Sequence, residues 1–170
     1  IRDQPRSRGR GDVYKRQVGE TSGAKWSEFD FENNIWSIPP ERRKDGKPYP
    51  HRVPLSRQAL EVLKSIERTS EFVFAINGEE GSKYSLTTMF KRMTGTNATM
   101  HGFRSTFRDW AAENEINDSV AEKCLMHSAG NAVVQAYQRS DLLELRRPVM
   151  QAWADAVFAL QPDGELSKPI

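Results

Sequence analysis

Two short apolar runs on either side of a polar turn set the first constraint on the fold. One run lies in "NNIWSIPP" (residues 33–40), where two prolines stop it, and the other lies in "HRVPLS" (residues 51–56). Short runs rich in β-branched and aromatic residues and bounded by proline are typical of strands. Between them, Asp45 and Gly46 form a pair that favours a tight hairpin turn. The sequence therefore predicts a small antiparallel sheet.

After the second run, the spacing of apolar residues becomes helical. Ser56 can cap a helix in which Leu60, Leu63 and Ile66 recur at helical spacing. The segment "EFVFAING" (residues 71–78) interrupts this pattern and indicates a short buried strand that ends in an Asn-Gly turn.

The rest of the chain has a mainly helical pattern. We expect helices in "SLTTMFKRMTG" (85–95), "GFRSTFRDWAAENEI" (102–116), "DSVAEKCLMH" (118–127) and "NAVVQAYQR" (131–139), and a last helix that begins at Pro148. The predicted fold class is therefore α+β and mainly helical, with a small antiparallel sheet or hairpin beside a helical bundle.

The two ends of the chain differ in composition from its middle. Residues 1–17 lack apolar periodicity and are either a disordered basic tail or foreign sequence, because "RGRGDVYKRQ" resembles translated adapter read-through. We expect residues 18–160 to form one domain, which is large enough to bury a core without disulfides or metal. Residues 161–170 are expected to be a flexible tail.

Composition limits the cellular setting. The chain has a single cysteine, Cys124, and no Cys/His cluster with zinc-ligand spacing, so we expect neither a disulfide nor a structural metal. No apolar run approaches the roughly 20 residues that span a bilayer, and the N-terminus lacks the zones of a secretory signal. We therefore expect a soluble cytoplasmic protein without a membrane partner.

Positive charge is local rather than global. The formal net charge is +2, but residues 1–16 hold six basic and two acidic residues, so 19 basic and 21 acidic residues remain in the rest of the chain. The overall balance gives no sign of nucleic-acid binding. The hairpin is different, since a basic hairpin can lie along a phosphate backbone, although a solvated charged turn is the commoner explanation. Its basic residues are Arg42, Arg43, Lys44, Lys47, Arg52 and Arg57.

Two motifs carry side chains that suit chemistry at a phosphate. In "HGFR", His101 and Arg104 lie three residues apart, so at the start of a helix both can grip an oxyanion from one face. One H-x-x-R sequence is nevertheless usually a surface arginine and a partly buried histidine. In "CLMHSAGNAVVQAY", His127 precedes a turn and Tyr137 lies in the next helical segment. Taken alone, this tyrosine is more often a core side chain.

Together with Lys44, these residues form a set suited to phosphoryl transfer without a metal. Cations would bind a pentavalent phosphate, an acid would protonate the leaving group, and a hydroxyl would be the nucleophile. Two alternatives stay open. One is a DNA-binding or assembly module without chemistry, and the other is a phosphoesterase for small substrates, which gives no reason for the basic hairpin.

The ordered set of Lys44, "HGFR", "LMH" and "AYQRSD" resembles the catalytic domain of the tyrosine recombinases, specifically the P4-like phage and genomic-island integrases. The similarity extends from about residue 18 to residue 160 and includes linking segments such as "HRVPLSRQALEVL". The resemblance implies the fold of the DNA breaking-rejoining enzymes and site-specific DNA integration through a covalent 3′-phosphotyrosyl intermediate. It implies no cofactor and no metal.

The resemblance also implies a role for each residue of the set. Tyr137 would attack the scissile phosphate, and Arg104 would hold its non-bridging oxygens with a bidentate fork. His101 and His127 would hydrogen-bond the phosphate, with His101 as the base, and Lys44 would protonate the departing 5′ oxygen. The residues expected to contact DNA are Arg42, Arg43, Lys47 and Arg52.

One position departs from the family pattern. The family places a first catalytic arginine directly before an x-G-E box, here "VGET", and Gln17 occupies that position. Arg16 is one residue early, and a shift of one residue turns a helical side chain by about 100°. Whether the chain is a gene fragment joined to foreign sequence or a degenerate recombinase, we expect its activity to be impaired. The family's N-terminal DNA-binding domain has no counterpart in the sequence, so we expect weak specific binding.

The resemblance implies partners as well. They are double-stranded DNA at attachment sites and further copies of the chain, as a tetramer on that DNA, with accessory DNA-bending proteins as additional candidates. A bacterial, nucleoid-associated location follows from the same resemblance. The segment "VMQAWADAVFAL" has an apolar face that would pack either on a neighbouring protomer or on its own domain.

Overall fold

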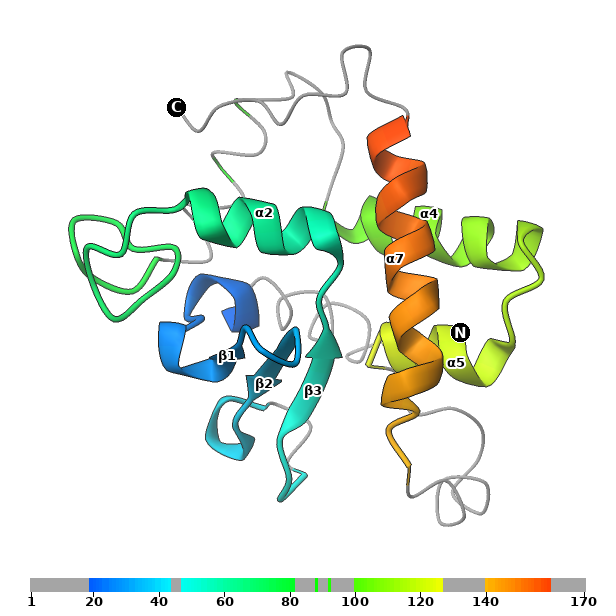
Figure 1. Cartoon of the computed structure of the whole chain (residues 1–170), viewed down its shortest axis with the longest axis horizontal. Helices are drawn as coiled ribbons and strands as arrows, with labels where there is room; N and C mark the ends of the chain where they lie inside the picture. The colour runs from blue at the N-terminus through cyan, green and yellow to red at the C-terminus, as the bar shows by residue number, and fades with distance from the viewer. Residues whose placement is uncertain are drawn as a thin grey trace, which may run out of the picture.

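The computed structural model describes residues 19–43, 47–81, 100–126 and 140–159, together with positions 88 and 92, and it describes only the backbone at residues 100 and 101. Figure 1 shows two groups of elements, a small sheet covered by helix α2 and a set of three helices beside it. The predicted Asp45-Gly46 turn and the predicted helices at 85–95 and 131–139 lie outside the described residues.

The sheet has three antiparallel strands in the order β1-β2-β3. β1 (Phe29–Asp30) pairs with β2 (Ile35–Ile38), and β2 pairs with β3 (His51–Pro54) so that Ile38 lies opposite His51. The predicted pairing of the two apolar runs is therefore confirmed. β1 was not predicted, because a strand of two residues is too short to show an alternating pattern.

Helix α2 (Arg57–Ser65) begins where the sequence predicts. The Ser56 hydroxyl oxygen accepts a hydrogen bond from the Ala59 N–H at 3.2 Å, which satisfies one of the backbone donors exposed at a helix start. Leu63 is buried on the inner face of this helix, and Ile66 lies just past its end.

Three further helices form the bundle. α4 (Met100–Glu113) and α5 (Asp118–Cys124) confirm two predicted helices with small changes at their ends. α7 (Leu143–Ala159) packs against α5 and against β3, and Figure 1 shows it crossing in front of α4 and α5 next to β3. α7 therefore joins the bundle to the sheet. Within the described ranges, none of the helices has the length and apolar character needed to cross a membrane.

Phe107 lies in the middle of the bundle core. Its side chain is only 4% exposed, and its ring meets that of Trp153 edge-on with centroids 5.5 Å apart. Trp110 packs 5.2 Å from Trp153, so three aromatic rings hold α4 against α7. The buried residues of this cluster are Phe107, Ala111, Val120, Ala121, Leu125 and Val149.

A separate apolar cluster holds the sheet and α2 together. The rings of Phe29 and Trp36 stack 5.4 Å apart because these residues lie opposite each other on β1 and β2. Ala24, Leu63 and Val73 are the buried members of this cluster. The sheet group thus has a core of its own beside that of the bundle.

The prediction of a strand at residues 71–78 is wrong. Phe72 makes only an isolated antiparallel bridge with Lys25, because the chain after Lys25 turns at once into a 3-10 helix, Trp26–Glu28. The turn at the end of this segment is confirmed. Asn77 and Gly78 have φ angles of 54° and 83°, the left-handed values that a tight turn of this kind requires.

The predicted start of the last helix is also wrong. Helix α7 begins at Leu143, and Pro148 lies inside it. The earlier start has local causes, since the Asp141 carboxylate accepts a hydrogen bond from the Leu143 N–H at 3.3 Å. Pro148 lies on the exposed side of the helix together with Glu144, so water can satisfy the Glu144 carbonyl that the missing N–H leaves unbonded.

Two phenylalanines of α4 test where the stability of the bundle comes from. Replacing the buried Phe107 by alanine should cost about 3–5 kcal/mol, because it removes a large side chain from a packed core. The matched change at Phe103, one helical turn earlier and 52% exposed, should cost no more than about 0.5 kcal/mol. Urea unfolding followed by circular dichroism gives both values, and equal losses would contradict this account of the core.

Candidate active site

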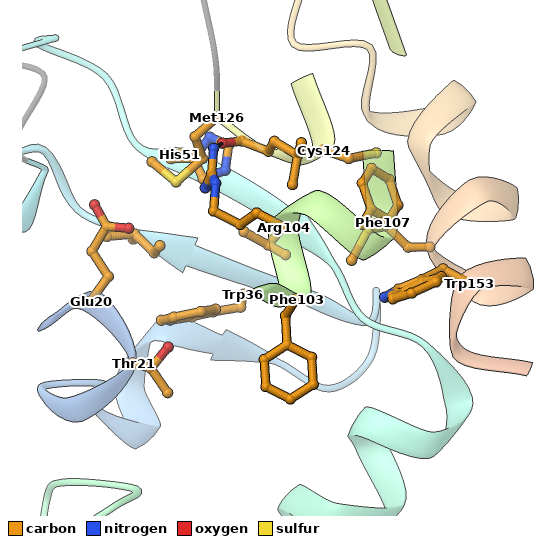
Figure 2. Close-up of a pocket in the computed structure, with 14 residues that line it drawn as sticks. Glu20, Thr21, Trp36, His51, Phe103, Arg104, Phe107, Cys124, Met126 and Trp153 are labelled. Carbon is orange, nitrogen blue, oxygen red and sulfur yellow. Dashed lines mark hydrogen bonds between the residues drawn. The ribbon is translucent and has the colours of Figure 1, made fainter. Parts of the chain in front are cut away.

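A cavity of about 330 Å³ lies where the sheet meets the bundle. The helical turn at residues 19–22, strands β2 and β3, helices α4 and α7 and the end of α5 all contribute to its wall (Figure 2). Aromatic rings such as Trp36 and Phe107 make much of the wall apolar, whereas Arg104, His51 and Glu20 add polar groups. Elements far apart in the sequence therefore converge on one hollow.

Arg104 is the predicted catalytic residue whose side chain the structure describes. Its Nη2 donates a hydrogen bond to the Leu125 carbonyl oxygen at 2.8 Å. Burial lowers the pKa of Arg104 below its usual value, and the carboxylates of Glu122 and Glu20 oppose that shift. A guanidinium still keeps its proton at physiological pH. The cavity thus has a positive charge on a half-buried side chain, where it attracts an anion more strongly than it would in water.

His51 is a residue at this site that sequence reasoning missed. It is the first residue of β3, it is only 9% exposed, and it lines the cavity together with Val53. Figure 2 shows its ring close to the Arg104 guanidinium. The period of two along a strand was the available signal, since His51 and Val53 must share one face while Arg52 points to the other.

Arg42, which the sequence predicted to contact DNA, makes contacts inside the protein. Its guanidinium donates to the Glu28 carboxylate and to the Glu20 backbone carbonyl oxygen. The same Glu28 carboxylate accepts a hydrogen bond from the Trp36 indole N–H at 2.8 Å. Arg42 therefore ties the helical turn that carries Glu20 to strand β2.

Arg43 and Arg52 also have partners within the chain. Arg43 is 8% exposed, donates to the Tyr49 carbonyl oxygen at 2.9 Å and lies over the Tyr49 ring. Arg52 is partly exposed and forms a two-point ion pair with Asp141, at 2.8 Å from Nε and 2.9 Å from Nη2. The prediction that these residues contact DNA is not tested by these contacts.

Lys47 lies near a second lysine, Lys123, at the end of α5. Burial lowers the pKa of Lys123, the positive charges of Lys47 and Arg146 lower it further, and Asp141 opposes them. Lys123 thus lies within reach of the positive charges of Lys47, from the loop before β3, and of Arg146, from α7. Such repulsion is relieved when an anion binds between the charges.

The structure does not bring the whole predicted set together. Lys44, His127, Tyr137 and Gln17 lie outside the described residues, and His101 is described only as backbone in the first turn of α4. Met126, the residue before His127, lines the cavity. Within the described ranges, no group of three or more His, Cys, Asp or Glu side chains is placed to hold a metal ion.

Comparison with known proteins identifies the family. The family model described as "Phage integrase family" matches residues 17–143, which is most of the chain. The chain belongs to the phage integrase family, as the motifs around Arg104 and Tyr137 predicted. No solved structure matches the chain.

Several curated relatives are similar over most of this chain. They include the prophage integrase IntA of Escherichia coli strain K12, 37% identical over 147 residues, and the integrase of Enterobacteria phage P4, 35% identical over 153 residues. The integrase of Shigella phage Sf6 is 31% identical over 144 residues. These matches cover 82%, 78% and 80% of this chain but only 35%, 35% and 37% of the relatives. The chain therefore spans about a third of the length of these relatives.

The contact between Arg42 and Glu28 gives a testable difference in stability. Arg42→Met leaves the Glu28 carboxylate buried without its cation, which should cost about 3–5 kcal/mol. The control is Arg57→Met, because Arg57 and Asp155 form an exposed pair with side chains 70% and 51% exposed, and its loss should cost no more than about 1 kcal/mol. Urea unfolding measures both. An Arg42 variant as stable as the control would show that the buried contact does not support this turn.

Proposed function

We propose that this chain supplies the catalytic domain of a tyrosine-type site-specific recombinase, which breaks and rejoins DNA through a bond between Tyr137 and a phosphate. The observation that carries the proposal is the half-buried Arg104 guanidinium on the wall of a cavity in a chain of the phage integrase family. An arginine fork in that setting suits the non-bridging oxygens of a phosphodiester. The similarity to named integrases supports DNA as the substrate.

In the proposed step, the Tyr137 oxygen forms a bond to phosphorus while the bond between phosphorus and the 5′ oxygen breaks. The tyrosine proton passes to His101, and Lys44 gives a proton to the leaving 5′ oxygen. Arg104 and His127 stabilise the charge on the non-bridging oxygens. Because the phosphotyrosyl bond replaces the broken phosphodiester, attack by a 5′ hydroxyl can rejoin the strand without an external energy source.

The proposed partners are double-stranded DNA at attachment sites and other copies of the chain, assembled as a tetramer on that DNA in the bacterial cytoplasm. A second candidate is a DNA-binding or assembly module without chemistry. Gln17 favours this alternative, since it stands where the family has its first catalytic arginine. The same DNA-cleavage experiment separates the two candidates.

The test is a covalent adduct between Tyr137 and DNA. Residues 17–170 with Gln17→Arg, joined to the amino-terminal half of a related integrase, should form an adduct with nicked duplexes taken from the DNA that flanks its gene. Denaturing electrophoresis detects it. With Gln17 retained, the rate should fall about 100-fold or more, because one donor to the phosphate charge is missing. Tyr137→Phe should form none. If no chain gives a Tyr137-dependent adduct, the recombinase proposal is wrong.

The predicted contact between Lys47 and DNA can be tested through the salt dependence of DNA affinity. In a Tyr137→Phe background, which binds without cleaving, Lys47→Gln should weaken binding to all duplexes alike and reduce the slope of log affinity against log salt by about 0.9 for one lost phosphate contact. Lys64→Gln on α2 is the matched control, since Lys64 is an exposed lysine that does not line the cavity. Fluorescence anisotropy gives both slopes, and identical slopes would place Lys47 away from DNA.

A further inference from the structure

Contacts hold the chain on either side of residues 127–139, the stretch that includes Tyr137. At its start, the Leu125 carbonyl accepts a hydrogen bond from Arg104, and Met126 lines the cavity. At its end, Asp141 is bound to Arg52 of β3, a residue 89 positions earlier in the chain. The contacts at this second end have no part in the function proposed above.

Three residues make the contacts at that end. The Arg52 guanidinium meets the Asp141 carboxylate at two points, 2.8 Å and 2.9 Å, which fixes the direction as well as the distance of the pair. Beneath them lies Arg146 of α7, whose side chain is 1% exposed. Its Nη1 donates to the backbone carbonyl oxygens of Arg52 at 2.9 Å and Asp141 at 3.3 Å. One buried cation therefore bonds both chain segments that the ion pair joins. We call Arg52, Asp141 and Arg146 the clasp.

The backbone takes an uncommon conformation at Met126 and at Leu142. Met126 has a φ angle of 58° and Leu142 one of 53°, so a residue other than glycine takes the left-handed conformation on either side of the Tyr137 segment. Such conformations are costly for branched or long side chains and persist where surrounding contacts hold them. At Leu142 these contacts include the Arg146 N–H, which donates to the Leu142 carbonyl oxygen at 2.9 Å.

Charge also concentrates at the clasp. Burial by itself would raise the pKa of Asp141, but the hydrogen bonds and charge of Arg52, the Leu143 N–H and the charge of Arg146 hold that pKa below its usual value of 3.8. Lys123 of α5 faces the same carboxylate. Asp141 thus balances cations from β3, α5 and α7, and its loss would leave like charges facing one another.

We propose that the clasp is a positioning device for the nucleophile. Arg52 and Arg146 hold Asp141 against strand β3, and Asp141 follows Tyr137 closely in the chain. Asp141 lies four positions after Tyr137, so the two can be at most about 14 Å apart. β3 also carries His51, which lines the cavity with Arg104. In this proposal, a fixed Asp141 limits how far the chain at Tyr137 can move from strand β3. This role rests on the proposed function, and it differs from a direct contact between Arg52 and DNA.

The first experiment needs no DNA and uses the full chain. Asp141→Asn should speed amide hydrogen exchange at residues 140–146 by about tenfold or more, because the two-point pair is lost and the Arg146 charge is no longer balanced. Glu144→Gln is the matched control, since Glu144 lies three residues later and forms an exposed pair with Arg147. In this control, amide exchange at residues 140–146 should stay unchanged. Mass spectrometry after peptide digestion measures both. Unchanged exchange in Asp141→Asn overturns the clasp.

The second experiment uses the chain that forms the adduct described above. Asp141→Asn should slow single-turnover adduct formation by about 100-fold while DNA affinity stays the same, because a misplaced nucleophile costs rate and not binding. Arg52→Gln should have a similar effect, and the double variant should be no worse than either single one. Arg52→Lys should restore part of the rate, since it keeps the charge but not the fork.

Two results would overturn the positioning role. One is Asp141→Asn with fast exchange and a normal adduct rate. The other is a pair of opposite effects on DNA affinity, in which Asp141→Asn binds DNA more tightly and Arg52→Gln binds it more weakly. That pair would show that Arg52 contacts DNA and that Asp141 competes with DNA for Arg52. If no chain forms an adduct, the recombinase proposal fails, while the exchange experiment still decides whether the clasp holds residues 140–146.

The pH dependence of exchange gives a further check on Asp141. Its pKa is lowered on folding, so its contribution is present above the unfolded value and is lost as the pH falls through the folded value, below 3.8. Arg52, Arg146 and Lys123, which face it, all stay protonated in acid. The exchange difference between the native chain and Asp141→Asn should therefore persist at pH 5 and higher and vanish in stronger acid. A difference that persists below the folded pKa would mean that the carboxylate charge is not the cause.

Discussion

The hydrogen bonds of the buried Arg146 guanidinium determine how the sheet group and the bundle are arranged relative to each other. It belongs to α7, which packs with α5 in the bundle, yet its hydrogen bonds end on the backbone of β3 and of Asp141. Carbonyl oxygens are well suited to such a cation, because they accept its hydrogen bonds without adding a second buried charge. The cavity lies along this junction, since His51 comes from β3 and Arg104 from α4. The distance between those two side chains therefore depends on a contact that neither of them makes.

Arginines near this junction serve different purposes despite their similar sequence context. Arg42 reaches a buried carboxylate and the backbone of a helical turn, Arg43 packs on a tyrosine, and Arg52 crosses to the bundle. Each of these contacts fixes part of the sheet group, whose own apolar core is small. The basic character of the hairpin thus reflects architecture as well as any attraction for phosphate. The positive charge of Lys47 acts on Lys123 of α5 and lowers the pKa of that lysine.

The sequence was a good guide wherever a local pattern decides the structure. Prolines and alternating side chains were enough to pair β2 with β3, and Ser56 was enough to place the start of α2, because both effects act within a few residues. The position of Pro148 was misleading because the Asp141 carboxylate, seven residues earlier, caps the start of the helix. The family motifs led to Arg104 and to the correct family. The partners of Arg42 and Arg52, however, lie as far as 22 and 89 residues away, and no charge pattern shows which arginine will reach a distant carbonyl or carboxylate.

The distribution of tryptophan divides the molecule evenly. The chain has four tryptophans, and Trp26 and Trp36 belong to the cluster under the sheet, whereas Trp110 and Trp153 belong to the bundle cluster. Each pair senses the packing of its own core, because indole emission responds to local polarity and to neighbouring rings. Fluorescence of chains that keep only one pair would therefore report separately on the sheet and on the bundle. The tryptophans are thus intrinsic fluorescent probes that can show whether the two cores unfold together or one after the other.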